Sequence, residues 1–152
     1  MYFLQSIVEF ESKASDCLIL VHPTTKILEQ AFEEFKQNEN FPVIDIGKEL
    51  SFYLLNITQT EQPRAIQKWI EGKVDESRPG PLFCIHIDFL FTPSFNLNPV
   101  TLFRQSARNS KLVVFWPGEY SSETLSYAVP EHRHYRVWHI SDPMITICRL
   151  YD

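Results

Sequence analysis

The sequence predicts an α/β fold in which a mostly parallel sheet is flanked by helices on both faces. One observation is an alternation, along the chain, of short apolar runs with longer segments that repeat apolar residues at helical spacing. Such alternation favours parallel strands joined by helices. Another is the segment Pro81–Pro93, PLFCIHIDFLFTP, which is apolar almost throughout and bounded by prolines. A run of this kind is typical of a strand buried on both faces, so we expect it to be a central strand.

The first half of the chain predicts strands at Cys17–Val21 and at Phe41–Ile46, the second of which ends at Gly47. An amphipathic helix is expected at about 2–13, and the segments 27–38, 48–56 and 59–72 also have helical apolar stripes. Pro63 suits the start of the last helix, because the first helical turn leaves its N–H groups without partners and proline has none.

In the second half, a polar linker at Lys73–Gly80 leads to the apolar segment described above. Pro99 is expected to begin a helix that runs to about residue 108, and 111–116 is a further strand, cut by Pro117 and Gly118. The pieces 125–129, 136–140 and 144–150 alternate or run apolar and predict late strands, with an antiparallel edge to the sheet.

Composition indicates one globular domain spanning 1–152, with its core at about 17–150. The chain is 44% hydrophobic and 22% charged, and its net charge of -5 argues against general nucleic-acid binding. Cys17, Cys84 and Cys148 lie in apolar runs without metal-ligand spacing, so we expect reduced, buried thiols and no metal site. The sequence shows neither a signal-peptide pattern nor an apolar run of membrane length, so we expect a cytoplasmic protein without a membrane partner.

The turn after the first strand occupies the place where a phosphate-binding loop belongs. Its residues are His22, Pro23, Thr24, Thr25 and Lys26. A phosphate loop needs glycines whose backbone N–H groups wrap the anion, whereas this turn has no glycine and Pro23 removes one donor. Two interpretations remain open: an ordinary turn in which a threonine caps the helix, or a helix N-terminus at which Lys26 holds an anion weakly.

Asp88 and His86 are the ionisable residues of the apolar segment Pro81–Pro93. Asp88 is either a cap or turn residue beyond the strand, or an acid that holds Mg²⁺ or polarises water at a nucleotide site. A lone histidine on a buried strand, such as His86, is more often a hydrogen-bonded core residue than a ligand or base. No Ser-His-Asp or Cys-His arrangement is recognisable, so the sequence predicts no catalytic residue.

A basic and aromatic segment lies near the end of the chain. It contains His132, Arg133, Tyr135, Arg136 and Trp138. This segment is either a solvated polar edge or a surface that meets a partner protein or nucleic acid. The histidines at 132 and 134 share a strand face, but no cysteine or acid completes a metal site.

Two blocks of the sequence carry a family resemblance. SARNSKLVVFWPGEY (106–120) resembles the SRNRxxVVAWPGEY segment of the BrxF family, the small P-loop proteins of type III BREX phage-defence systems. LSYAVPEHRHYR (125–136) is similar to that family's LTYAEPGHPEYR. Further similarity at 46–55 and 89–108 extends the resemblance over nearly the whole chain after Cys17. The resemblance implies a P-loop NTPase-like three-layer sandwich.

Both nucleotide motifs of that family are altered in this chain. The family has a glycine-rich Walker A loop, of which only Lys26 and a threonine carry over. When the Walker B pattern is laid on this sequence, its metal-holding Asp falls on Ile85, its Asn on His86 and its Glu on Asp88. The resemblance therefore implies a degenerate nucleotide site comprising His22, Thr24, Thr25, Lys26 and Asp88. We expect no cofactor there, with bound ATP and Mg²⁺ as the alternative.

The leading functional hypothesis from the resemblance is a pseudo-ATPase. It would be a non-catalytic subunit of an anti-phage defence or DNA-modification complex that contacts other defence proteins or further copies of itself. The expected contact surface comprises Trp116, Pro117, Gly118, Glu119, Tyr120, Tyr127, His132, Tyr135 and Arg136. One alternative is an atypical ATP-binding switch. Another is a DNA-contacting accessory protein that uses Arg104, Arg108, Lys111 and Arg133.

Overall fold

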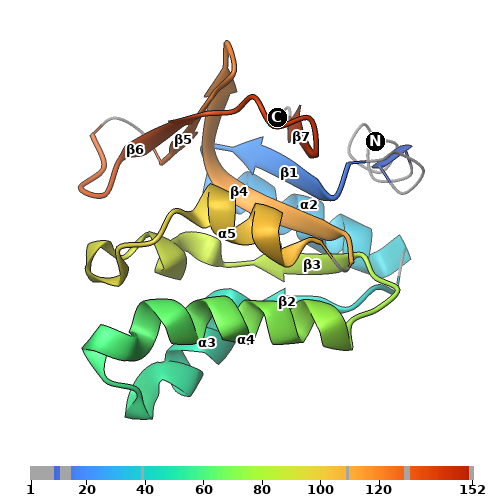
Figure 1. Cartoon of the computed structure of the whole chain (residues 1–152). Coiled ribbons are helices and arrows are strands. Elements are labelled where there is room, and N and C mark those ends of the chain that lie inside the picture. The colour runs from blue at the N-terminus through green and yellow to red at the C-terminus, as the bar shows by residue number, and fades with distance from the viewer. Residues whose placement is uncertain (1–8, 11–14, 39, 109, 129–130, 151–152) are drawn as a thin grey trace.

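The computed structural model describes the chain except residues 1–8, 11–14, 39, 109, 129–130 and 151–152 (Figure 1). The described residues form a 7-stranded sheet that contains a parallel path in the order β2-β3-β4-β1-β7. These strands are β1 (Cys17–His22), β2 (Val43–Asp45), β3 (Leu82–Ile85), β4 (Leu112–Ser121) and β7 (Ile145–Arg149). The mostly parallel sheet expected from the sequence is confirmed.

β1 is the most enclosed strand of this path. It pairs with β4 on one side, from Cys17–Leu112 to His22–Pro117, and with β7 on the other. Every side chain from Cys17 to Val21 is at most 1% exposed. The run CLILV is apolar at every position because both faces of this strand are covered.

Helices cover both faces of the sheet and give the fold three layers. α2 (Thr25–Asn38) lies behind the sheet in Figure 1, where Phe32 and Phe35 join Leu18 and Leu20 in one core cluster. The other face carries α3 (Ile46–Tyr53), α4 (Gln62–Glu76) and α5 (Pro99–Ser106). Their buried residues form a second core cluster, which includes Ile19 of β1. Ile19 lies on this face because successive side chains of a strand point to opposite faces.

Capping side chains define where α3 and α5 begin. Asp45 precedes α3, and its Oδ1 accepts from the Lys48 N–H at 3.0 Å while Glu49 accepts from the Asp45 N–H at 2.9 Å. Asn98 precedes α5, accepts a backbone N–H of the first turn at 3.2 Å, and is followed by Pro99 as expected. These bonds use N–H groups that a helix start leaves without partners. Short 3₁₀ segments lie at 54–56, 59–61, 87–91 and 93–95.

The apolar segment Pro81–Pro93 departs from the prediction of one strand. β3 ends at Ile85, and Ile87–Phe91 forms a 3₁₀ segment whose apolar residues stay largely buried, which explains why the whole run is apolar. His86, between them, has φ 54° and ψ 49°, a left-handed conformation that ends the strand. The expectation of a core histidine is wrong, because the His86 side chain is 52% exposed. β3 is the second strand of the path, between β2 and β4, and β4 occupies the centre.

β4 differs as well, because Pro117 and Gly118 do not end it. Its first part pairs in parallel with β1 up to Pro117, and the part from Gly118 to Ser121 pairs with β5 (Thr124–Tyr127) in antiparallel register. A Cβ at Gly118 would lie 1.8 Å from the Ser126 carbonyl oxygen, so only glycine allows β5 to approach this closely. The Pro-Gly pair thus marks a change of partner strand within β4.

β5 and β6 (Arg136–His139) form the antiparallel part of the sheet (Figure 1). β6 pairs with β5, and β5 with the end of β4. The late segment 144–150 instead provides β7, which runs parallel to β1. An antiparallel edge is confirmed, built on the end of β4.

The bounds of three other predicted segments differ from the structure or lie mostly outside the described residues. Gly47, predicted to end the second strand, is the second residue of α3, because the cap at Asp45 begins the helix. α4 continues to Glu76, into the segment expected to be a linker. The helix expected at 2–13 falls mostly outside the described residues. Within this range the structure describes Glu9 and Phe10, which are helical, and Phe10 is fully buried. No helix in the described ranges has the length and apolar character needed to cross a membrane.

Candidate functional site

A groove lies at the edge of the sheet where the parallel strands end. β2 ends at Asp45, β3 at Ile85, and the parallel part of β4 at Pro117. The groove has a volume of about 360 Å³ and is lined by α2 and by residues at the ends of β3 and β4. Open parallel sheets bind their ligands at this edge. The groove is therefore our candidate site.

The floor of the groove is apolar. Leu28 and Phe32 lie one helical turn apart on α2, and Ile85 and Phe115 line the groove from the sheet. The rings of Phe32 and Phe115 meet edge to face, with their centroids 5.7 Å apart. Ile85 is only partly buried and Val43 of β2 is 41% exposed, so α2 leaves part of this sheet face open.

The polar lining of the groove is mainly acidic. Glu29 and Glu33 are exposed and one turn apart on α2, and Asp88 stands in the 3₁₀ segment after β3. Thr25 and His86 complete the polar lining, in which no described lysine or arginine takes part. Three carboxylates around one groove create a negative potential that attracts cations and repels phosphate groups.

The turn between β1 and α2 satisfies one of its own N–H groups. Nδ1 of the buried His22 accepts from the Thr24 N–H at 2.9 Å. The Thr24 carbonyl accepts from the Leu28 N–H at 3.3 Å, which makes Thr24 the residue that precedes α2. Thr25 lines the groove, whereas Lys26 is exposed and lies outside the lining. This geometry is that of an ordinary strand-to-helix turn, and anion binding at Lys26 stays a prediction.

Asp88 has a structural partner in Tyr127 of β5. The Tyr127 hydroxyl donates to Asp88 Oδ2 at 3.4 Å, and Tyr127 is only 4% exposed. Burial raises the pKa of Tyr127 from 10.0 to about 12, and the negative charge of Asp88 adds to the effect. Asp88 thus connects the 3₁₀ segment to the antiparallel strands.

His86 connects the ends of β2 and β3. Its Nδ1 lies 3.0 Å from Asp45 Oδ2, while the other oxygen of Asp45 caps α3. The imidazole therefore has a local partner within the sheet edge, at the margin of the groove.

The predicted contact surface divides between the core and the exterior. Trp116, Pro117, Gly118 and Tyr127 are buried; Tyr120 and Arg136 are partly buried; Glu119, His132 and Tyr135 are exposed. Of the four buried residues, Pro117 lines the groove, whereas Trp116, Gly118 and Tyr127 are enclosed within the fold. For the other residues a contact role stays a prediction.

The buried aromatic residues pack the antiparallel strands against the rest of the fold. Phe91 stacks on Tyr127 with centroids 3.7 Å apart and meets Trp116 edge to face at 5.0 Å. Trp138 lies 5.5 Å from Trp116, and the Arg136 guanidinium sits 4.9 Å from the Trp138 ring. Such pairs add to the stabilisation from burial alone. In this structure much of the WPGEY block serves packing.

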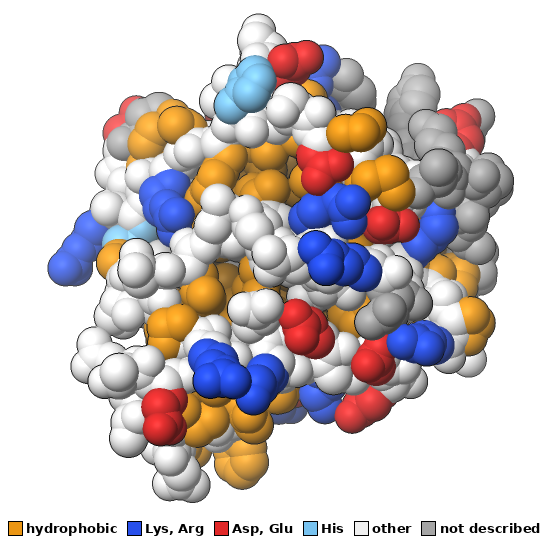
Figure 2. Space-filling model, in the orientation of Figure 1, with side chains coloured by type: hydrophobic (Ala, Val, Ile, Leu, Met, Phe, Trp, Pro, Cys, Tyr) orange, Lys and Arg blue, Asp and Glu red, His pale blue; other side chains and the backbone are white. Residues whose placement is uncertain are grey.

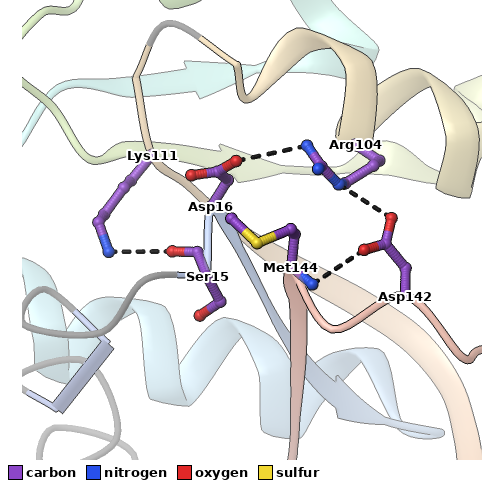
Figure 3. A network of polar contacts seen from close by, with 6 residues as sticks. All are labelled: Ser15, Asp16, Arg104, Lys111, Asp142 and Met144. Atoms are coloured by element: carbon purple, nitrogen blue, oxygen red, sulfur yellow. Dashed lines mark hydrogen bonds and ion pairs between the residues drawn. The ribbon is translucent and has the colours of Figure 1, made fainter.

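Arg104, predicted to contact DNA, forms ion pairs within the chain (Figure 3). Its Nε lies 2.9 Å from Asp142 Oδ2, and one terminal nitrogen lies 3.3 Å from Asp16 Oδ2. Figure 3 shows the guanidinium between these two carboxylates, which come from the residue before β1 and from the segment before β7.

Two of the other predicted DNA-contacting residues, Arg108 and Lys111, line one hollow together with Asp16, the partner of Arg104. The Lys111 ammonium donates to the carbonyls of Ser15 and Phe10 at 2.9 and 2.7 Å. Arg108 follows α5, whereas Arg133 lies in the connection between β5 and β6, and both are exposed. DNA contact stays a prediction, because Arg104 and Lys111 are engaged in contacts within the chain and Arg133 is not part of this hollow.

Two of the three cysteines are enclosed in the core. Cys17 and Cys84 are buried, and burial raises the pKa of the Cys17 thiol to about 12 and that of Cys84 further. Cys148 is only partly buried, unlike the expectation. Within the described ranges no group of three His, Cys, Asp or Glu residues is placed to hold a metal ion.

Sequence reasoning missed Glu29 and Glu33. Both looked like part of the solvated face of α2. The signal that could have found them is a pair of acids at i and i+4 beside Leu28 and Phe32, directly after the first strand. Comparisons with protein-family models, with curated proteins and with solved structures found no match to this chain.

Proposed function

We propose that this chain is a nucleotide-independent, P-loop-like protein that acts as a subunit of an anti-phage defence or DNA-modification complex through contacts with other proteins. The charge of the groove carries this proposal. Where a P-loop protein would hold a polyphosphate, the chain presents Glu29, Glu33 and Asp88. The sequence blocks that resemble the BrxF family supply the defence context.

The order of the strands supports the P-loop-like part of the proposal. β1 is followed directly by α2, the connection in which a P-loop lies. β4 alone separates β1 from β3, so the turn after β1 and the end of β3 lie near each other at one edge of the sheet. The position for a phosphate loop is therefore present, without the residues that bind phosphate.

The turn and the groove together support the loss of nucleotide binding. The Thr24 N–H is bonded to His22, and Pro23 has no N–H to offer. Two unit charges of like sign repel by about 1–4 kcal/mol at 4 Å near a protein surface, so each groove carboxylate opposes a bound phosphate.

Exposed apolar residues support a role in protein contacts. Phe52 and Leu55, at the end of α3 and in the 3₁₀ segment that follows, are 77% and 73% exposed. Figure 2 shows hydrophobic side chains at the lower end of the molecule, where Figure 1 places this region. Neighbouring large apolar residues left in water are typical of a surface that another protein covers.

Thermal unfolding with ATP and Mg²⁺ tests the nucleotide part of the proposal. We expect no rise in Tm at millimolar ATP–Mg²⁺, because a ligand specific for the folded state would have to stabilise it. Lys26→Ala is expected to respond as the unmodified chain does. A rise in Tm that disappears in Lys26→Ala would contradict the proposal and support an ATP-binding switch.

Co-expression with the proteins encoded beside this chain tests the subunit role. We expect the tagged chain to retain at least one of them, and Phe52→Ser/Leu55→Ser to retain less of it. Gln59→Ser/Thr60→Ser is the matched control, because it changes two exposed polar residues of the next 3₁₀ segment. If the tagged chain retains none of these proteins, the subunit role is wrong.

A further inference from the structure

The groove that opposes a nucleotide favours a ligand of the opposite charge, and this inference rests on the proposed role in protein contacts. We propose that the groove binds an extended segment of a partner protein that places one arginine or lysine side chain between Glu29, Glu33 and Asp88. Apolar side chains of the same segment then cover Leu28, Phe32 and the neighbouring sheet.

The sheet face on the side of α2 is partly exposed at two positions. Ile44 of β2 joins the core on the side of α3 and α4, so its neighbour Val43 faces the side of α2. Val43 is 41% exposed there, and Ile85 of the adjacent β3 is only partly buried. Val43 begins β2 and pairs with Phe83, whereas Ile85 pairs with Asp45, so Ile85 is the open sheet residue that lines the groove with Leu28, Phe32 and Phe115.

The charges of the groove select a cationic partner. Glu29 and Glu33 are exposed and form no ion pair with any described residue. The nearest cations along α2 are Lys26, three residues before Glu29, and Lys36, three residues after Glu33. Lys36 lies over the Phe32 ring, with Nζ 6.0 Å from its centroid. Because the chain carries a net charge of -5, the surroundings also favour approach of a basic segment.

The size and chemistry of the groove favour a long basic side chain on a peptide. A volume of about 360 Å³ accommodates such a side chain with part of its neighbours. The methylenes of arginine or lysine lie well on an apolar floor while the charged head reaches the carboxylates. Arginine suits the site better, because its planar fork can bond two oxygens at once. A metal ion fits less well, since no three groove residues are placed to ligate one among those described.

Nuclear magnetic resonance of the ¹⁵N-labelled full chain tests the proposal. The probe is the peptide acetyl-Ala-Leu-Arg-Leu-Ala-amide, compared with the same peptide carrying Gln in place of Arg and with free spermidine. We expect the Arg peptide to shift amide signals of residues 28–33 and 85–88 in a saturable manner. Glu29→Gln/Glu33→Gln is expected to weaken this binding about tenfold, since each exposed charge pair contributes a few tenths to one kcal/mol.

Glu61→Gln/Glu71→Gln is the matched control, because it removes the same charge from helical segments on the other face of the sheet. It is expected to leave the affinity unchanged. The proposal is wrong if the Arg peptide shifts no groove signals, if the Gln peptide binds equally well, or if only spermidine binds. If these tests fail while Glu29→Gln/Glu33→Gln still retains a co-expressed partner, the groove inference falls and the subunit role stands. An ATP-dependent rise in Tm would instead overturn the proposed function.

Discussion

Gly118 stands where β4 leaves the parallel ladder and approaches β5. A Cβ there would lie 1.8 Å from the Ser126 carbonyl oxygen and 3.0 Å from Trp116 Nε1. That indole nitrogen donates to the same carbonyl at 2.9 Å, so both neighbours are held in place. Gly72 of α4 is the opposite case, because a Cβ there would meet nothing within 4 Å.

Gly118→Ala is expected to lower the free energy of unfolding by about 3 kcal/mol, because the obstructing atom belongs to the backbone and cannot move aside cheaply. Gly72→Ala is expected to raise it by about 0.5–1 kcal/mol, since alanine loses less backbone entropy in a helix. Urea unfolding of the two variants measures both changes. A shift of the same sign in both would contradict this account of Gly118.

The pKa of Tyr127 predicts a loss of stability at high pH. Folding raises this pKa from 10.0 to about 12 by burial and by the charge of Asp88, so the folded state holds the phenolic proton more tightly than the unfolded chain. The resulting stabilisation is fully present below about pH 10 and is lost as the pH rises to about 12.

Comparison of the unmodified chain with Tyr127→Phe isolates this contribution. The difference in free energy of unfolding is expected to fall above pH 10 by up to about 1.4 kcal/mol per pH unit. Urea unfolding between pH 8 and pH 11 measures it. A difference that stays constant over this range would show that the Tyr127 hydroxyl titrates normally.

At the scale of elements, Arg104 of α5 connects the start of β1 to the segment that leads into β7. It pairs with Asp16 and Asp142, and Asp142 Oδ1 accepts from the Met144 N–H at 2.9 Å (Figure 3). Lys111, just before β4, bonds to the Ser15 carbonyl beside this network. The side chains of Arg104 and Asp16 are each 27% exposed, so water screens these pairs only in part.

Arg104→Met is expected to lower the free energy of unfolding by about 1–2 kcal/mol, because it leaves two carboxylates without their cation. High salt should reduce the difference between the variant and the unmodified chain. Arg108→Ala, at an exposed neighbouring position, should stay within about 0.5 kcal/mol. Urea unfolding at low and high salt measures these changes, and equal losses in both variants would exclude a specific role for the Arg104 pairs.

The groove is also a consequence of how elements are distributed. Among the described helices, α2 covers one sheet face, while α3, α4 and α5 share the other. Phe32 and Phe35 direct α2 over β1, β4 and part of β3, where Phe115 and Phe83 lie. Ile85 at the end of β3 is left only partly buried, and it forms the groove floor with Leu28, Phe32 and Phe115, where we propose that a partner segment binds.

At the scale of the whole molecule, the strand order brings distant carboxylates together. Glu29 and Glu33 belong to the helix after β1, whereas Asp88 follows β3. They share a groove because β4 alone separates β1 from β3 and every strand of this path ends at the same edge. The same order places His86 beside Asp45, joining the ends of β3 and β2.

The sequence by itself determined the classes of element and the parallel character of the sheet. Cys17–Val21 is apolar at each position and could only be an enclosed strand or helix, and the stripe of Leu28, Phe32 and Phe35 specifies α2 locally. The absence of glycine between His22 and Lys26 likewise excluded a normal phosphate loop before any contact was known. These features can be predicted from the sequence because the type of an element and the conformation of a turn depend mainly on residues that are close together in the chain.

Only the tertiary structure decided where strands stop and which residues face one another. β3 ends at Ile85, before His86, whose side chain pairs with the distant Asp45. β4 continues through Gly118 because this part of the strand pairs with β5. Burial of Trp116 and Tyr127 also depends on packing of the antiparallel strands. The acidic groove has the same origin, since no local pattern places Asp88 opposite Glu29. Side-chain burial and charge proximity are properties of the folded chain, and they carry the proposed function.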